Sequence, residues 1–155
     1  MMPEGFSRET SIRRTEEGLW FHDGEPVEHP GVRRAFDGWI DRAEDGRYIL
    51  RNEVNWAYVE VEGAPVFVLH ARADQETVRL QLGDHRTENL DFDSLRQDVD
   101  GFLYCSVREG RLTAKFTRDA LFDLDGLWVE DEDGQVAIRW RDRIHPIPVT
   151  EEPVR

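Results

Sequence analysis

The sequence of 155 residues contains a single cysteine, Cys105. One thiol cannot form a disulfide within the chain, and it cannot build a thiolate metal cluster. Long apolar runs are missing too, so we expect no segment that spans a membrane. The polar residues 1–14 lack the apolar stretch that a signal peptide carries. Together these absences make the cytoplasm the expected compartment.

Lysine is almost absent, since Lys115 is the only one and the other basic residues are arginines. Acidic residues outnumber basic ones by 33 to 20, and the formal net charge is −13. A field of this sign repels nucleic-acid phosphates and anionic lipids, so we expect neither nucleic acid nor membrane as a partner. Any anion site would instead rely on arginine, whose planar guanidinium binds carboxylate or phosphate through two hydrogen bonds.

Motifs of the common enzyme classes are also missing. The sequence contains no G-x-S-x-G, no G-x-G-x-x-G and no P-loop. The Asp-rich stretches lack the pattern of a calcium-binding loop. Metal-ligand spacing such as H-E-x-x-H is absent among the histidines, which are His22, His29, His70, His85 and His145. We therefore expect no catalytic site, no metal and no cofactor.

The N-terminal half does contain clear signals for short strands and one helix. The stretch "GLWFHDGEPV", residues 18–27, predicts a hairpin that turns at Asp23-Gly24, a pair typical of type I′ turns. Pro30 then suits the first turn of a helix. Apolar residues at helical spacing predict this helix over residues 30–44. The core of this part is expected to contain Trp20, Val32, Phe36, Trp39 and Ile40.

The C-terminal half repeats this order of elements. A central strand is expected over residues 66–71, and residues 102–116 predict a second hairpin that turns at Glu109-Gly110. A short helix capped by Thr117 follows, and a third hairpin surrounds Asp133-Gly134.

The order of hairpin, helix and strand thus occurs twice. It predicts an α+β fold of two small related subdomains with mostly antiparallel sheets. We place the N-terminal subdomain at residues 12–63 and a β-rich C-terminal subdomain with one short helix at residues 64–148. Residues 1–11 and 149–155 are expected to be tails.

Several of these stretches carry a family resemblance. They are "GLWFHDGEPV", "DGRYIL", "NWAYVEVEGAPVFV" and "SVREGRLTAKFTRDALFDL". Over most of residues 18–147 the sequence resembles the bacterial family called domain of unknown function 1285 (DUF1285). The resemblance implies two related α+β domains, the second loosely similar to a pleckstrin-homology fold. It also implies a small, nucleotide-like ligand at the domain interface and a role in signalling. Asn55 stands where the resemblance leads us to expect a lysine.

The hairpin over residues 102–116 carries most of the candidate binding residues. With a two-residue turn, Tyr104 faces Lys115 and Arg108 faces Arg111 on one face, while Cys105 lies on the apolar face. Opposed like charges cost up to about 1 kcal/mol unless something neutralises them. This face is therefore either an anion pocket or a solvated surface whose cations pair with nearby acids. A bulge at the glycine would shift the register by one residue.

Trp56 is a further candidate, because its ring could either stack on a ligand or pack against the neighbouring subdomain. We expect a non-catalytic binding protein that holds a small anionic or nucleotide-like ligand at the subdomain interface. The residues assigned to this site are Trp56, Tyr104, Arg108, Arg111 and Lys115. Two alternatives stay open. One is a protein-interaction module whose acidic surface and edge strands take a basic partner. The other is a hydrolase that uses His22 or His85 with nearby carboxylates.

Overall fold

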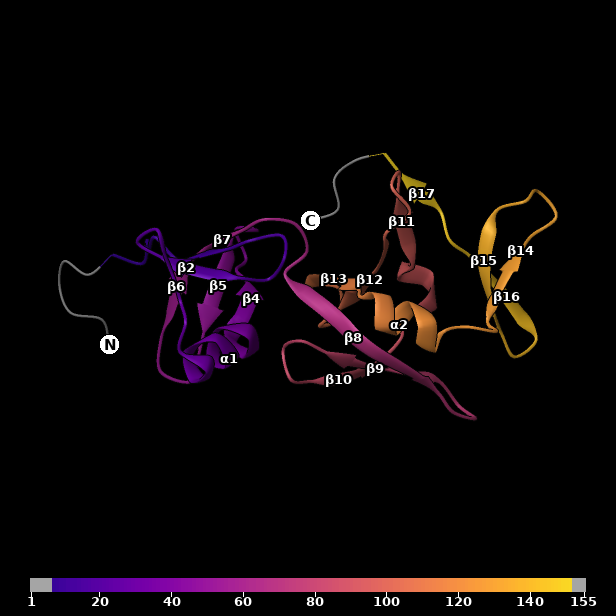
Figure 1. Cartoon of the computed structure of the whole chain (residues 1–155), viewed down its shortest axis with the longest axis horizontal. Helices are drawn as coiled ribbons and strands as arrows, with labels where there is room; N and C mark the ends of the chain where they lie inside the picture. The colour runs from indigo at the N-terminus through magenta and orange to yellow at the C-terminus, as the bar shows by residue number, and fades with distance from the viewer. Residues whose placement is uncertain (1–6, 152–155) are drawn as a thin grey trace.

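The computed structural model describes residues 7–151 and has an α+β fold with mostly antiparallel sheets. Figure 1 shows the N-terminal subdomain as one lobe of an elongated molecule, with the strands from β8 onward forming the remainder. The fold class predicted from the sequence, with two subdomains, is thus confirmed. None of the helices formed by residues 7–151 combines the length and the hydropathy that a membrane crossing requires.

The described residues of the N-terminal subdomain form two small sheets and one helix. The first sheet has the order β3-β2-β1-β7, with strands Glu25–Pro26, Trp20–His22, Arg13–Arg14 and Glu60–Val61. The second has the order β4-β5-β6, with strands Ile40–Arg42, Tyr48–Arg51 and Trp56–Tyr58. Helix α1, Pro30–Trp39, lies between β3 and β4 along the chain.

Turn and cap chemistry explain where these elements begin. Asp23 and Gly24 have φ angles of 53° and 79°, positive as a type I′ turn requires, so the predicted hairpin is confirmed. Pro30 occupies the first turn of α1, and the Nδ1 atom of His29 accepts a hydrogen bond from the Gly31 amide at 3.0 Å. The imidazole thereby replaces the usual oxygen acceptor at the helix N-terminus.

Helix α1 is shorter than the sequence predicts. It ends at Trp39 instead of residue 44, because Ile40–Arg42 pairs with β5 as strand β4. The core prediction is also corrected in part. Trp20 and Ile40 are buried, but Val32 and Trp39 are 38% and 37% exposed. Because α1 packs mainly against β5, side chains at the margins of its apolar stripe stay in contact with solvent.

Within the described residues, the C-terminal subdomain is built on a seven-stranded sheet of order β10-β9-β8-β13-β12-β11-β17. In that order its strands are Thr87–Asn89, Val78–Leu82, Val66–Ala73, Leu112–Phe116, Leu103–Val107, Arg96–Asp98 and Val149–Thr150. The β8–β13 and β11–β17 pairs are parallel. Both expected tails are therefore too long, since Val149 and Thr150 pair with β11 and the Arg8 carbonyl accepts the Tyr58 amide at 2.8 Å.

Two helices and a small sheet complete this subdomain. The 3₁₀ helix η1, Phe92–Ser94, precedes β11, and helix α2, Arg118–Asp123, follows β13. The sheet β14-β15-β16 consists of Trp128–Glu130, Val136–Trp140 and Arg143–Pro146. In both subdomains a hairpin, a helix and a three-stranded antiparallel sheet follow one another along the chain. The predicted repetition of elements is present, and it includes the whole of each three-stranded sheet.

Candidate binding site between the subdomains

The β12–β13 hairpin has the strand register that the sequence predicts. Tyr104 pairs with Lys115, and Cys105 pairs with Ala114 on the buried face. The turn differs from the prediction. Arg108, Glu109 and Gly110 all have positive φ angles, of 53°, 57° and 88°. The Arg111 amide still donates to the Arg108 carbonyl at 3.1 Å around Glu109-Gly110, but Arg108 lies outside the strand and the two side chains take separate acidic partners.

Both arginines of this turn pair with acids, but only Arg108 is buried, and the Arg111 side chain stays 49% exposed. Arg108 Nε donates to Asp84 Oδ2 at 2.9 Å, and the two side chains are 9% and 0% exposed. Arg108 Nη2 also donates to the Ile40 carbonyl at 3.4 Å. Arg111 Nε donates to Asp41 Oδ1 at 3.2 Å. Because Ile40 and Asp41 belong to β4, the turn joins the two subdomains.

Three of the five predicted site residues have local partners of their own. Lys115 Nζ lies 3.8 Å from the centroid of the Phe102 ring. The Tyr104 hydroxyl donates to Asp98 at 3.0 Å, and burial together with this hydrogen bond raises the pKa of Tyr104 to about 12. Trp56 packs edge-on against Tyr58 with 5.1 Å between ring centroids.

Arg108 and Arg111 thus reach the subdomain junction, and these three residues take other partners. In the sequence, one hairpin face and one nearby aromatic residue suggested a common site for all five.

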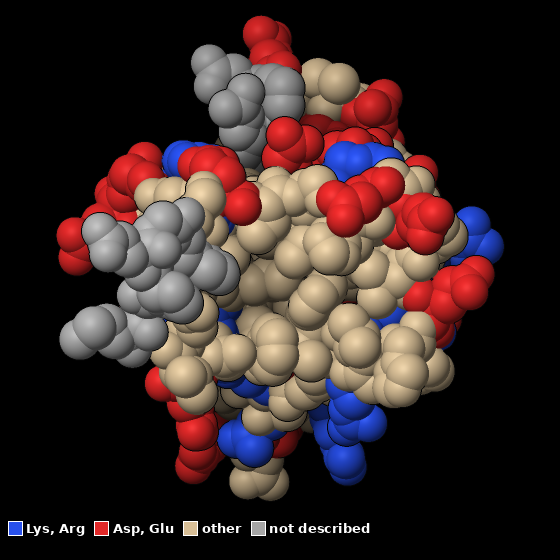
Figure 2. Space-filling view, turned by 90° about the vertical axis from the view of Figure 1, so that its left-hand side faces the viewer, with Lys and Arg blue, Asp and Glu red and all other residues tan. Residues whose placement is uncertain are grey.

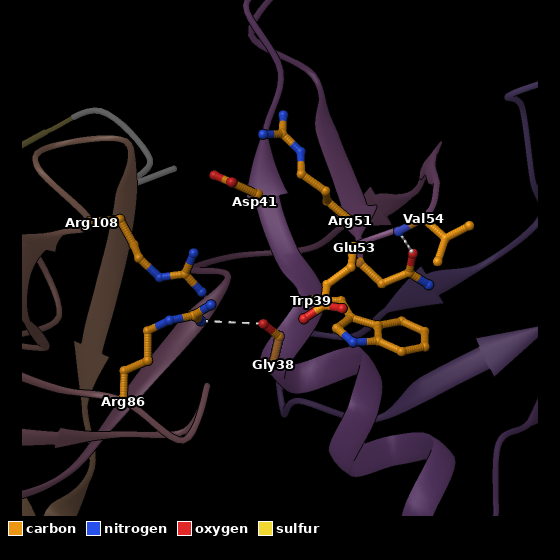
Figure 3. Close-up of a pocket in the computed structure, with 9 residues that line it drawn as sticks. Gly38, Trp39, Asp41, Arg51, Glu53, Val54, Arg86 and Arg108 are labelled. Carbon is orange, nitrogen blue, oxygen red and sulfur yellow. Dashed lines mark hydrogen bonds between the residues drawn. The ribbon is translucent and has the colours of Figure 1, made fainter. Parts of the chain in front are cut away.

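A pocket of about 600 Å³ opens at this junction (Figure 3). The N-terminal subdomain contributes the end of α1, the start of β4 and the β5–β6 turn. The C-terminal subdomain contributes two arginines, which extend toward the N-terminal subdomain in Figure 3. The lining residues are Gly38, Trp39, Asp41, Arg51, Asn52, Glu53, Val54, Arg86 and Arg108.

The arginines in and beneath this pocket outnumber the carboxylates with which they form ion pairs. Arg86 Nη1 lies 3.4 Å from Asp84 Oδ2, so Arg86 and Arg108 share one fully buried carboxylate. Arg86 also donates to the Gly38 carbonyl at 3.2 Å. Within residues 7–151 the exposed Arg51 guanidinium forms no hydrogen bond or ion pair. Sequence reasoning missed Arg51 and Arg86, because their meeting depends on how the two subdomains pack.

A smaller cavity of about 210 Å³ lies next to this pocket, and its lining includes Arg14, Asp37, Asp84 and His85. Arg14 is only 3% exposed, and its Nη1 donates to the Ala64 carbonyl at 2.7 Å. No carboxylate among residues 7–151 comes within ion-pair distance of Arg14, and its buried Nε has no partner there. Asp37 accepts a hydrogen bond from Trp20 Nε1 at 2.7 Å, yet desolvation raises the pKa of Asp37.

The histidines proposed for hydrolysis are held in different surroundings. His22 lies 3.7 Å from Asp23 on the exposed first hairpin. His85 lines the smaller cavity, and its Nε2 lies 3.0 Å from the Arg34 carbonyl. Over residues 7–151, no three His, Cys, Asp or Glu side chains are grouped so that they could hold a metal ion. Metal independence stays a prediction.

Comparison with known proteins identifies the fold. No protein-family model matches the sequence. The search of curated proteins finds no match. A DUF1285 family protein from Silicibacter pomeroyi DSS-3 superposes with a TM-score of 0.69 at 24% identity, over 90% of this chain and 80% of that one. The chain has the fold of the DUF1285 proteins.

A second DUF1285 family protein, from Shewanella baltica OS155, gives a TM-score of 0.58 at 21% identity. That match covers 76% of this chain and 91% of the other. The resemblance found in the sequence motifs is therefore confirmed for the fold. In this DUF1285 fold, the pocket of Figure 3 lies where the two subdomains meet.

Proposed function

We propose that the protein is a non-catalytic binding protein whose junction pocket holds a small anionic ligand. The observation that supports this proposal best is the convergence of Arg51, Arg86 and Arg108 from two subdomains on one pocket of about 600 Å³. This local group of positive charges contrasts with the net charge of −13 of the whole chain. Pockets of this volume suit small molecules, and a few converging polar groups give them specificity.

The local charge balance favours an anion. Arg86 and Arg108 share Asp84, and Arg111 occupies Asp41. Among the residues that line the pocket, three arginines therefore stand against two carboxylates, Asp41 and Glu53. The remaining positive charge and the open donors of Arg51 and Arg86 suit a phosphate or a carboxylate.

The pocket also offers apolar surface for the rest of such a ligand. Trp39 is 37% exposed and Val54 is 88% exposed, and both line the pocket on its N-terminal side. An indole ring can stack on a flat group such as a nucleobase. Trp39 thereby takes the role that the sequence analysis gave to Trp56, and the preferred ligand is nucleotide-like or an aromatic acid.

A ligand here would also act on the contacts between the subdomains. Arg86 donates to Gly38, Arg108 donates to Ile40, and both acceptors belong to the N-terminal subdomain. An anion that draws these guanidiniums toward itself would weaken the two contacts and favour another subdomain orientation. This coupling supports a sensing role in signalling.

Thermal unfolding with a panel of nucleotides, sugar phosphates and aromatic carboxylates tests the proposal. A binding anion should raise the melting temperature, and the shift should shrink as salt is added. Arg86→Ala and Arg51→Ala should each remove most of the shift. Arg143→Ala, at an exposed arginine of β16, is the matched control and should keep it. No response at low millimolar ligand, or a full response in both pocket variants, would overturn the proposal.

A protein-interaction module is the second candidate function. Figure 2 shows a broad uncharged surface, hollowed near its centre, on the end formed by the N-terminal subdomain, with acidic residues along its upper edge and both basic and acidic residues below it. The high exposure of Val54 adds an apolar contact point. A basic peptide array tests this candidate. Binding that is lost in Val54→Asp, with no response to any small anion, would favour it over the ligand proposal.

A further inference from the structure

The exposed face of the sheet formed by β8, β9 and β10 carries a cluster of polar side chains, which lies apart from the junction pocket. His70 pairs with Gln81, which pairs in turn with Thr87, so these three residues form a row across three strands. Arg72 pairs with Arg79 in the adjacent row. All five residues line a cavity of about 510 Å³, which shares none of its lining residues with the pocket of Figure 3.

Asp123 of helix α2 holds the His70 ring in place. Asp123 Oδ2 lies 3.0 Å from His70 Nδ1 and accepts the Ala71 amide at 3.0 Å. The pairing of β13 with β8 ends at Val68, so no strand on that side supplies an acceptor for the Ala71 amide, and Asp123 takes this place. The two hydrogen bonds, with the Ala71 amide contributing more, hold the pKa of Asp123 below its ordinary value. The carboxylate keeps a proton on Nδ1 and leaves Nε2 directed away from α2.

Neither arginine of this face forms an ion pair within the described residues, although the charge of Asp74 attracts Arg79 from beyond ion-pair distance. Directly opposed like charges destabilise a sheet unless another charge neutralises them. Within residues 7–151 neither Arg72 nor Arg79 forms an ion pair or a hydrogen bond through its guanidinium. Asp74 is the one carboxylate among the lining residues. Its Oδ1 accepts the amides of Thr77 and Glu76, at 2.9 and 2.7 Å, and these bonds, with a smaller contribution from the charge of Arg79, lower the pKa of Asp74.

We propose that this face is a second anion site, and that its ligand is a phosphate group. The two guanidiniums would bind separate oxygens, while the Gln81 amide and the Thr87 hydroxyl donate to the others. His70 Nε2 completes the site as an acceptor from a protonated oxygen or, when charged, as a further donor. A tetrahedral phosphate can engage donors spread over three strands, whereas a planar carboxylate is satisfied by one guanidinium. This proposal is independent of the junction pocket.

Two-dimensional NMR with inorganic phosphate as the probe tests the proposal. Phosphate should shift the backbone and side-chain signals of His70, Gln81 and Thr87, and acetate at the same ionic strength should shift them far less. Arg72→Gln and Arg79→Gln should each weaken phosphate binding about tenfold or more. Both side chains are exposed, so neither change should prevent folding.

Two further variants separate this site from other arginines. Arg33→Gln, at an exposed position of α1, is the matched control and should bind phosphate like the native protein. Arg86→Ala removes a junction arginine and should leave the His70 shift intact. Absence of the His70 shift at low millimolar phosphate would overturn the proposal. Equal shifts with acetate, or full binding by both glutamine variants, would overturn it as well.

Discussion

Arg108 and Asp84 form a buried ion pair between two turns, with Arg108 Nε 2.9 Å from Asp84 Oδ2. The turns belong to the β12–β13 and β9–β10 hairpins, so the pair joins segments that are adjacent only in the folded chain. The Arg108 amide also donates to both carboxylate oxygens of Glu88 at 3.1 Å. These contacts explain why Arg108 adopts a left-handed backbone conformation that a long side chain seldom takes.

Removal of the buried acid should be costly. Asp84→Ala leaves Arg108 buried without a carboxylate, and we expect a loss of about 3–5 kcal/mol in the free energy of unfolding. Arg108→Ala should cost less, because Arg86 still faces Asp84. Urea denaturation measures both changes. Asp142→Ala, at an exposed aspartate, is the control and should stay within about 0.5 kcal/mol of the native protein. A loss below about 1 kcal/mol in Asp84→Ala would contradict the pairing.

Phe36 provides a second test, in the N-terminal core. Its ring packs edge-on against Trp20 at 5.3 Å between centroids, but Phe36 is only partly buried. We expect Phe36→Ala to cost about 2–3 kcal/mol, less than the loss at a fully buried phenylalanine. Phe122→Ala is the control, since that side chain is 70% exposed and should change stability little. Similar losses in the two variants would show that α1 does not rest on Trp20.

The hairpins and the end of α1 show what the sequence can and cannot predict about this fold. Turn pairs and alternation are local signals, and they gave the hairpin at Asp23-Gly24 and the register that buries Cys105. The end of α1 is different. Ile40 continues the helical spacing as well as it fits a strand, and the sequence cannot show that pairing with β5 is the more favourable outcome.

Asp37 should make stability depend on pH in an identifiable direction. Desolvation raises its pKa, so the folded protein binds this proton more tightly than the unfolded chain does. The resulting stabilisation is fully present below the unfolded-state pKa and is lost as pH rises through the folded-state pKa. Relative to Asp37→Asn, the native protein should therefore lose stability as the pH rises above about 4, the ordinary pKa of an aspartate. Urea titrations across that range measure the difference. A gain of stability over the same range would mean that Arg14 lowers the Asp37 pKa.

The Cys105 thiol should be unreactive in the native protein. Its thiol is fully buried, and desolvation raises the pKa of Cys105 to about 12. The thiolate is the reactive form, so Ellman's reagent should release no thiol at neutral pH until urea unfolds the chain. The unfolded protein supplies the internal control, because its one cysteine should then react in full. Rapid reaction before unfolding would show that the β12–β13 face opens in solution.

The candidate site could be predicted only in part. One alternative in the sequence analysis, that the hairpin cations pair with nearby acids, correctly describes Arg108 and Arg111. Their partners, however, lie far away in sequence: Asp84 is 24 residues from Arg108, and Asp41 is 70 residues from Arg111. No local pattern connects such residues. Arg51 and Arg86 meet at the same pocket for the same reason, since the packing of two subdomains brings them together.

The parallel pairing of β8 with β13 has a consequence for the route by which the chain folds. Val66 pairs with Ala114, so a long loop must close before β8 acquires its second neighbour. The hairpins β8–β9, β12–β13 and β15–β16 need only short loops and can form early. The slow step is then the joining of two preformed hairpins along β8 and β13. Contacts that are distant in sequence, more than helix formation, should set the refolding rate.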